Sequence, residues 1–195
     1  MPNDIFGKDS DMTLYLIRHG QDDNSVRGGW SSSPLTPQGV SEAEALAQRI
    51  LNSPNINITK VFSSDLARAK QTAEIIASKI NITVELLPQF RETNNGALAG
   101  MKNDIAVIKF PGIYWNTLEW DEPYPDGESP HQFFDRISIA WNDFKNSLKD
   151  TDGNVILVTH GGVINVIYHI ENKLEYSNKN KPFPIGHAEF VSFII

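Results

Sequence analysis

Residues 14–20 read Leu-Tyr-Leu-Ile-Arg-His-Gly, an apolar run that ends on a cation, an imidazole and a glycine. The β-branched and aromatic content of residues 13–17 predicts a buried strand. Ligands in open α/β sheets bind beyond the carboxyl ends of the strands, so Arg18 and His19 are expected to face a site. Gly20 permits the sharp turn and the close approach of a ligand that such a site needs.

A second apolar run ends in the same way. Residues 155–159 read Val-Ile-Leu-Val-Thr and lead directly into His160-Gly161-Gly162. Because parallel strands deliver their carboxyl ends to one edge of a sheet, the two imidazoles of His19 and His160 are expected side by side.

The bulk composition limits the kind of protein. A chain of 195 residues fits one domain with a substantial core, and 40% hydrophobic with 21% charged residues is typical of a globular protein. The net charge of -7 argues against a nucleic-acid partner, although a local cationic pocket could still hold a small anion. The absence of cysteine excludes disulfides, thiolate metal sites and a cysteine nucleophile.

No targeting or membrane segment is expected. Residues 1–11 are polar and are predicted to form a loose tail without the features of a signal peptide. No apolar stretch approaches the roughly 20 residues that span a bilayer. The sequence therefore predicts a cytoplasmic protein without a membrane partner.

Strand and helix patterns alternate along the chain. Strands are predicted at residues 60–63, 82–87 and 190–195, and helices from Thr36-Pro37, after residues 63–65 (Ser-Ser-Asp, all competent caps), from Ser129-Pro130 and over residues 163–170. Residues 97–127 lack periodicity and contain Trp115 and Trp120, so they are predicted to form a lid insertion. The fold class predicted is α/β: a three-layer α/β/α arrangement around a mostly parallel, doubly wound sheet.

Arg68 occupies an unusual position in the first turn of a predicted helix, where a cation opposes the helix dipole. The same helix end attracts anions, so an arginine there is best explained if it faces a bound anion.

The ordered set of motifs resembles the histidine phosphatase superfamily, also called the phosphoglycerate mutase-like family. The motifs are Arg18-His19-Gly20, Pro34-Leu35-Thr36-Pro37-Gln38-Gly39, the segment 63–73 with Arg68, Arg91-Glu92 with the segment 96–100, Gly127-Glu128-Ser129 with Arg136, and Thr159-His160-Gly161-Gly162. The resemblance covers nearly the whole chain. It implies one phosphoglycerate mutase-like domain over residues 1–195.

The resemblance implies a phosphatase that works without a metal or cofactor on a small phosphoester. His19 would be the nucleophile that forms a phosphohistidine, and Glu92 the general acid and then the general base. Arg18 and Arg68 would grip the phosphoryl oxygens as bidentate forks, and His160 would stabilise the transition state. Further phosphate contacts would come from Gly161 and from one or more of Gln21, Asn24 and Ser25.

The chain departs from the family pattern after the nucleophile. Asp22 stands where Ser or Thr is usual, and it is expected to point away from the phosphate or to pair with Arg27. The usual Asn position holds Ser25, with Asn24 one place early, so the choice among the candidate phosphate ligands stays open. Glu42 stands where the family often has Gln.

Two alternative functions remain at this point. The first is phosphoglycerate mutase activity, because the segment from Glu92 to Gly100 is similar to that of the mutases of the family. Those mutases have a longer insertion that protects the intermediate from water, whereas this chain is short, and Thr93 stands where they tend to have a substrate-binding arginine. A non-catalytic phosphate-binding module is the second alternative, which the two intact histidines argue against. His131, His169 and His187 are predicted to be surface or packing residues, with His187 nearest the site. The chain could be a monomer or a homodimer.

Overall fold

The computed structural model describes residues 12–53, 56–180 and 182–195, so the tail expected at residues 1–11 lies outside it. One five-stranded sheet has the order β3-β2-β4-β1-β5. Its strands are β1 (Thr13–Arg18), β2 (Ile58–Ser63), β3 (Val84–Leu86), β4 (Asn154–Thr159) and β5 (Phe190–Ile194). All neighbours pair in parallel except β5, which runs antiparallel to β1. The predicted mostly parallel sheet is confirmed.

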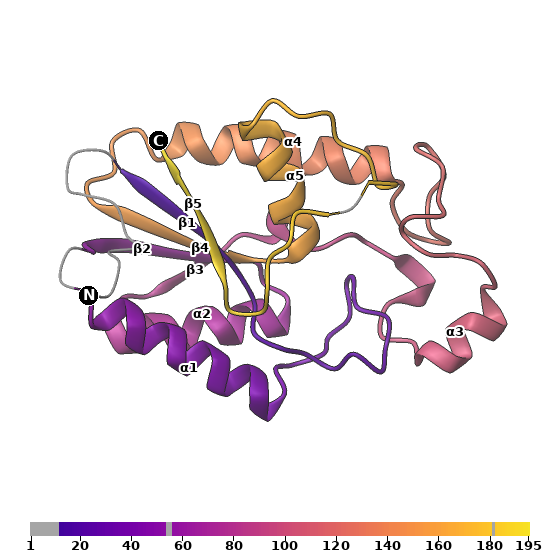
Figure 1. Ribbon diagram of the computed structural model, residues 1–195, viewed down its shortest axis with the longest axis horizontal. Coiled ribbons are helices and arrows are strands. Elements are labelled where there is room, and N and C mark those ends of the chain that lie inside the picture. The colour runs from indigo at the N-terminus through magenta and orange to yellow at the C-terminus, as the bar shows by residue number, and fades with distance from the viewer. Residues whose placement is uncertain (1–11, 54–55, 181) are drawn as a thin grey trace.

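Helices cover both faces of this sheet (Figure 1). Helices α1 (Pro37–Leu51) and α2 (Ala67–Ile80) lie on one face, and α4 (Pro130–Ser147) and α5 (Gly161–Glu171) lie on the other. This is the predicted three-layer α/β/α fold. Within the described residues, no helix is long and apolar enough to cross a membrane.

The local sequence explains where two of these helices begin. Thr36 caps α1, where its hydroxyl accepts a hydrogen bond from the Gly39 amide, and Pro37 follows at the first helical position. Ser129 and Gln132 form a reciprocal capping box at the start of α4. Both starts were predicted from the sequence.

The expected cap of α2 is wrong. The residue before α2 is Leu66, which makes no side-chain cap. The hydroxyl of Ser64 lies instead within hydrogen-bond distance of His160, and the carboxylate of Asp65 pairs with Arg91. Two of the three side chains that could cap α2 therefore contact distant residues instead, and the hydroxyl of the third, Ser63, donates to the carbonyl of Ser64.

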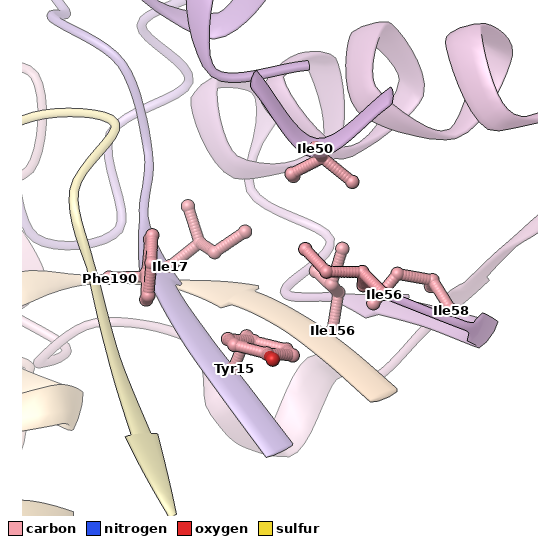
Figure 2. A pocket seen from close by; sticks show the side chains of 7 residues that line it. All are labelled: Tyr15, Ile17, Ile50, Ile56, Ile58, Ile156 and Phe190. Carbon is pink, nitrogen blue, oxygen red and sulfur yellow. The ribbon is translucent and has the colours of Figure 1, made fainter. Parts of the chain in front are cut away.

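Alternation along the strands divides the core between the two faces. Leu14 and Leu16 face α4 and α5, whereas Tyr15 and Ile17 face α1 and α2. Figure 2 shows a small apolar pocket on the second side, which is surrounded by side chains of the sheet, Ile50 of α1 and Ile56 just before β2. Its lining carries no charged side chain, so this pocket belongs to the core.

The segment between β3 and α4 is irregular, with short 3-10 turns at η1 (Pro88–Phe90) and η2 (Gly96–Leu98) and the helix α3 (Asn103–Lys109), which was not predicted. In Figure 1, α3 lies away from the layered body of the molecule. The segment has a small apolar cluster of its own around Leu98, Leu118 and Tyr124. A bridge between Val26 and Lys102 joins it to the loop that follows β1.

Candidate active site

The parallel pairing of β1 and β4 brings the two histidines together. Arg18 lies opposite Thr159 in the register of the sheet, so His19 and His160 leave the two strands at the same level. Their ring centroids are 5.1 Å apart. The strand ends therefore form one imidazole pair at the edge of the sheet.

His19 has a defined tautomer. Its Nδ1 lies 2.7 Å from the carbonyl oxygen of Gly20, which can only accept, so Nδ1 carries the proton. Nε2 is then the basic nitrogen, and it accepts a hydrogen bond of 3.1 Å from Nε of Arg68. Burial and the charge of Arg68 hold the pKa of His19 well below 6.5, so the ring is neutral.

Arg68 is buried in the first turn of α2, as its position in the sequence predicts. Its Nη2 donates to the carbonyl of Gly29 at 2.7 Å, and its Nη1 lies 3.3 Å from the carbonyl and the hydroxyl of Ser31. Burial lowers the pKa of Arg68, and the negative charge of Asp22 acts in the opposite direction. The loop after β1 thus fixes the guanidinium largely through uncharged oxygens.

Arg18 is held by the segment that precedes β5. Its Nη1 donates to the carbonyl of Ile185 at 2.8 Å, and its Nη2 lies 3.0 Å from Nε2 of His187. Burial and the charge of Arg18 lower the pKa of His187. The Nε of Arg18 is buried and has no hydrogen-bond partner among the described residues.

His160 is fully buried behind His19. Its Nε2 lies 2.9 Å from the hydroxyl of Ser64, and its Nδ1 has no hydrogen-bond partner within the part of the chain described. Burial, followed by the charge of Arg68, holds the pKa of His160 well below 6.5. This ring is also neutral.

Glu92 reaches the same cavity from the loop after η1. Its Oε1 accepts a hydrogen bond from the amide of Thr93 and its Oε2 accepts one from the amide of Gly162, each at 3.0 Å. The main-chain carbonyl of Glu92 accepts from Trp30 Nε1 at 2.7 Å and from Arg136 Nη2 at 3.1 Å. Both ends of the residue are therefore fixed, and the carboxylate lies at the N-terminus of α5.

The structure does not bring all of the candidate phosphate ligands to the cavity. Gly161 lines it as the first residue of α5. The Oε1 of Gln21 accepts a hydrogen bond from Thr36 at the start of α1. Asn24 and Ser25 are exposed on the loop, and neither lines the cavity.

Of the two expectations for Asp22, the pairing with Arg27 is wrong. Its carboxylate does not pair with Arg27 but lies 3.4 Å from Nε of Arg68. An isolated bridge to Leu35 fixes the backbone of Asp22 where the loop returns toward α2. A negative charge therefore stands beside a cation that is expected to bind phosphate.

The resulting cavity has a volume of about 740 Å³. Arg18, His19 and Glu92 lie on its lining, which the irregular segment and the chain before β5 complete with aromatic side chains. These aromatic residues are Tyr114, Trp115, Tyr124, Tyr176 and Phe183. Trp115 also packs edge-on against Phe133, so it serves the core and the cavity together. Among the described residues, no group of three or more His, Asp or Glu side chains could hold a metal ion.

Sequence reasoning missed two residues of this site. His187 lies against Arg18 with its ring centroid 5.8 Å from that of His19, and Ser64 contacts His160. His187 is predicted from the sequence to be a surface or packing residue that the last strand can bring near this edge of the sheet, so its contact with Arg18 was missed but not its place. Ser64 was interpreted as a cap because its partner lies 96 residues away.

Comparison with known proteins identifies the class. The chain belongs to the histidine phosphatase superfamily (branch 1), whose family model matches residues 14–192. The predicted family and its enzymatic character are thereby confirmed. The fold is consistent with this membership, because the solved structures with a similar fold include phosphatases.

Individual relatives are similar over most of the chain. A probable phosphoglycerate mutase of Proteus mirabilis is 35% identical over 67% of this chain, a match that spans 62% of that relative's own length. A probable phosphoglycerate mutase of Photorhabdus laumondii is 30% identical over 86% of this chain and 81% of that relative. A mycobacterial glucosyl-3-phosphoglycerate phosphatase in complex with inorganic phosphate superposes with a TM-score of 0.74 and 25% identity, over 93% of this chain and 88% of that one.

The neutral histidines predict how stability depends on pH. His19 and His160 titrate well below 6.5 in the folded protein and near 6.5 in the unfolded chain. Below about pH 6.5 the unfolded chain binds more protons than the folded protein. The two neutral histidines therefore make their full contribution to the free energy of unfolding above this pH, and the contribution is lost as the pH falls toward the folded pKa values. Urea denaturation between about pH 7 and about pH 5 should show a loss of up to ~1.4 kcal/mol per pH unit for each histidine.

Two variants separate this effect from other titrations. His160→Asn should reduce the acid-dependent loss of unfolding free energy, because one of the two groups is gone. His131→Asn is the control, since the pKa of exposed His131 is raised by its hydrogen bond to Asp121 and cannot cause this loss. An unfolding free energy that does not change over this range would contradict the neutral, buried state of both rings.

The position of Asp22 predicts an effect on anion binding. Asp22→Asn removes a negative charge 3.4 Å from Arg68 Nε. Inorganic phosphate, measured as a competitive inhibitor or by calorimetry, should then bind about five-fold more tightly, since one like charge near an anion costs on the order of 1 kcal/mol when partly screened. Asp23→Asn is the matched control, because its carboxylate bonds only locally to the Ser25 amide. Weaker phosphate binding by Asp22→Asn would show that Asp22 instead supports Arg68.

Proposed function

We propose that the protein is a metal-independent phosphomonoester hydrolase that acts on a small phosphorylated metabolite through a phosphohistidine at His19. The observation that carries the proposal is the state of His19. Its Nδ1 proton is donated to Gly20, and its basic Nε2 lies against Arg68 at the edge of the cavity. A neutral imidazole of fixed tautomer beside a buried guanidinium suits attack on an anionic phosphorus centre.

The two arginines neutralise the incoming phosphate. A phosphomonoester is a dianion and repels a nucleophile unless its oxygens are paired with cations. Arg18 and Arg68 supply guanidinium forks that are already fixed by main-chain carbonyls, so little reorganisation is needed when an anion enters. His160, neutral and buried beside His19, would donate a hydrogen bond to an equatorial oxygen.

Glu92 is the proton carrier of the proposed reaction. In the first step, His19 Nε2 forms a bond to phosphorus, the ester P–O bond breaks, and Glu92 gives its proton to the leaving oxygen. In the second step, Glu92 takes a proton from water, which attacks phosphorus and releases phosphate and neutral His19. Hydrogen bonds to both carboxylate oxygens from main-chain amides support a fixed orientation for these transfers.

Phosphoglycerate mutase activity is the second candidate, because the curated relatives reported above carry that name. Hydrolysis is favoured by the residue after Glu92: Thr93 lines the cavity where a mutase would need a substrate-binding arginine. A superposed structure with 25% identity is a phosphatase in complex with inorganic phosphate, which supports the same choice. We also propose that residues 97–127 act as a lid over the cavity, since Tyr114, Trp115 and Tyr124 come from them.

The test compares two reactions and one variant. The protein should hydrolyse p-nitrophenyl phosphate in the presence of EDTA, and should do so faster than it isomerises 3-phosphoglycerate. His19→Ala should lower turnover by at least about 10³-fold while phosphate still binds, because the arginines remain. Rapid acid-free quenching should detect the phosphohistidine by phosphorus NMR only in the parent protein. Faster isomerisation would favour the mutase, and no turnover of any phosphoester would favour a binding module.

The role of Glu92 is tested through a neighbouring glycine. A Cβ at Gly162 would lie 2.3 Å from Oε1 of Glu92, so Gly162→Ala should displace the carboxylate without disturbing the backbone. We expect kcat to fall by roughly 10²-fold for substrates with poor leaving groups and less for p-nitrophenyl phosphate, which needs little protonation. Gly161→Ala is the matched comparison with a smaller effect, since its Cβ meets Arg18 at 3.6 Å. Equal losses on both kinds of substrate would contradict general acid catalysis by Glu92.

A further inference from the structure

Arg27 is a cation of the cavity that the proposed reaction does not use. It lies on the loop after β1, where its amide donates to the carbonyl of Met101 and its carbonyl accepts from the amide of Gly100, each at 2.8 Å. The side chain lines the cavity together with Tyr114 and Tyr124 of the irregular segment. The backbone on both sides of Arg27 is thus fixed, and its guanidinium has a defined place.

The guanidinium of Arg27 has no carboxylate counterion among the residues that the structure describes. It lies over the ring of Tyr114 with its Cζ 4.5 Å from the ring centroid. Its Nε is buried without a hydrogen-bond partner, and no ion pair of Arg27 occurs among the described residues. A partly buried cation that keeps an unsatisfied donor has lost hydration without gaining an anionic partner.

Arg18 also keeps a buried Nε without a partner among the described residues, but the proposed reaction already uses its charge to bind the transferred phosphate. The other arginines near the cavity each have a carboxylate beside them. Arg91 pairs with Asp65 and Arg136 pairs with Glu128, while Arg68 has Asp22 beside it. The carboxylate among the cavity-lining residues is Glu92, and main-chain amides already occupy its two oxygens. The cavity therefore has a positive charge near Tyr114 that no side chain of the described lining balances.

We propose that Arg27 binds a second anionic group of the substrate, a carboxylate or a phosphate carried by the leaving group. The inference rests on the proposed function, since it assumes that the phosphoryl group to be transferred lies at His19. A planar fork of five N–H donors suits either anion. The substrate is thus a phosphomonoester with a further negative charge, not a neutral sugar or alcohol phosphate.

The size and lining of the cavity agree with such a substrate. Its volume of about 740 Å³ is much larger than a phosphate group needs. Besides Arg18 and Arg27, the lining includes the aromatic rings of Trp115 and Tyr124, which can contact a ring or a carbon chain. Packing of Arg27 on Tyr114 alone is the simpler explanation, and a cation–π contact of this kind contributes only about 0.5–1 kcal/mol. That explanation leaves the buried Nε without a role.

The experiment uses three hydrolysable aryl phosphates that differ only in the para substituent. The substituent is a carboxylate, its neutral isostere carboxamide, or a phosphonate, whose C–P bond is not itself hydrolysed. The values of kcat/KM are compared between the parent protein and the variants Arg27→Gln and Arg27→Lys. For the parent protein we expect kcat/KM of at least one anionic substrate to be about ten-fold higher than that of the carboxamide. The anionic substrate with the higher kcat/KM shows which group Arg27 binds. Arg27→Gln should bring that ratio close to one, and Arg27→Lys should keep part of it.

Arg49→Gln is the control for the loss of one positive charge, because Arg49 is exposed on α1 away from the cavity. It should retain both the activity and the preference of the parent. Melting temperatures of all variants verify folding. A parent protein without any preference for the anions, or a preference that survives in Arg27→Gln, overturns the role of Arg27 while hydrolysis itself stands. Failure to hydrolyse any of the hydrolysable esters would instead remove the proposed function.

Discussion

The site depends on the parallel pairing of β1 with β4. Because Arg18 lies opposite Thr159, the residues that follow the two strands meet at one level, and the imidazoles of His19 and His160 become neighbours. A shift of the register by one residue would turn the side chains of a strand to the opposite face and would break the apolar alternation that both faces need. The packing of α1, α2, α4 and α5 on the sheet therefore also fixes the chemical groups at its edge (Figure 1).

Electrostatics adds a second constraint to this arrangement. Arg18 and Arg68 are solvated mainly by main-chain carbonyls, those of Ile185, Gly29 and Ser31, which stabilise a cation without neutralising it. The remaining positive charge, together with burial, lowers the pKa of both histidines and keeps them neutral. In the proposed reaction, the same charges would keep the nucleophile neutral and attract the anion. Asp22 offsets part of this field, and we expect its position beside Arg68 to limit how strongly a free phosphate is retained.

The sequence was informative where structure is decided locally. Each feature that was predicted correctly can be recognised within a few residues. The structure has strands before His19 and His160, a cap at Thr36, and Arg68 in the first turn of α2. The partners of Ser64, Asp65 and His187 are not visible in the sequence, because these contacts join residues far apart in the chain. For His187, the sequence indicates only that it lies near this edge of the sheet. A serine near a helix start can cap the helix or contact a distant histidine. Only the closed fold decides between the two.

In the proposed function, the groups that carry out the reaction and the residues that select the substrate come from different parts of the fold. The groups of the proposed reaction come from strand ends and helix starts: Arg18 and His19 line the cavity, and Arg68 and His160 are buried next to His19. The outer wall of the cavity comes from loops, and these are joined to one another by main-chain hydrogen bonds such as those between Arg27 and residues 100–101. Substitutions in the outer wall can therefore change which ester is bound while the nucleophile keeps its tautomer and its partners. Enzymes of one family can in this way differ in specificity while they keep the same pair of histidines, and we expect residues such as Arg27 and Tyr114 to select the substrate of this one.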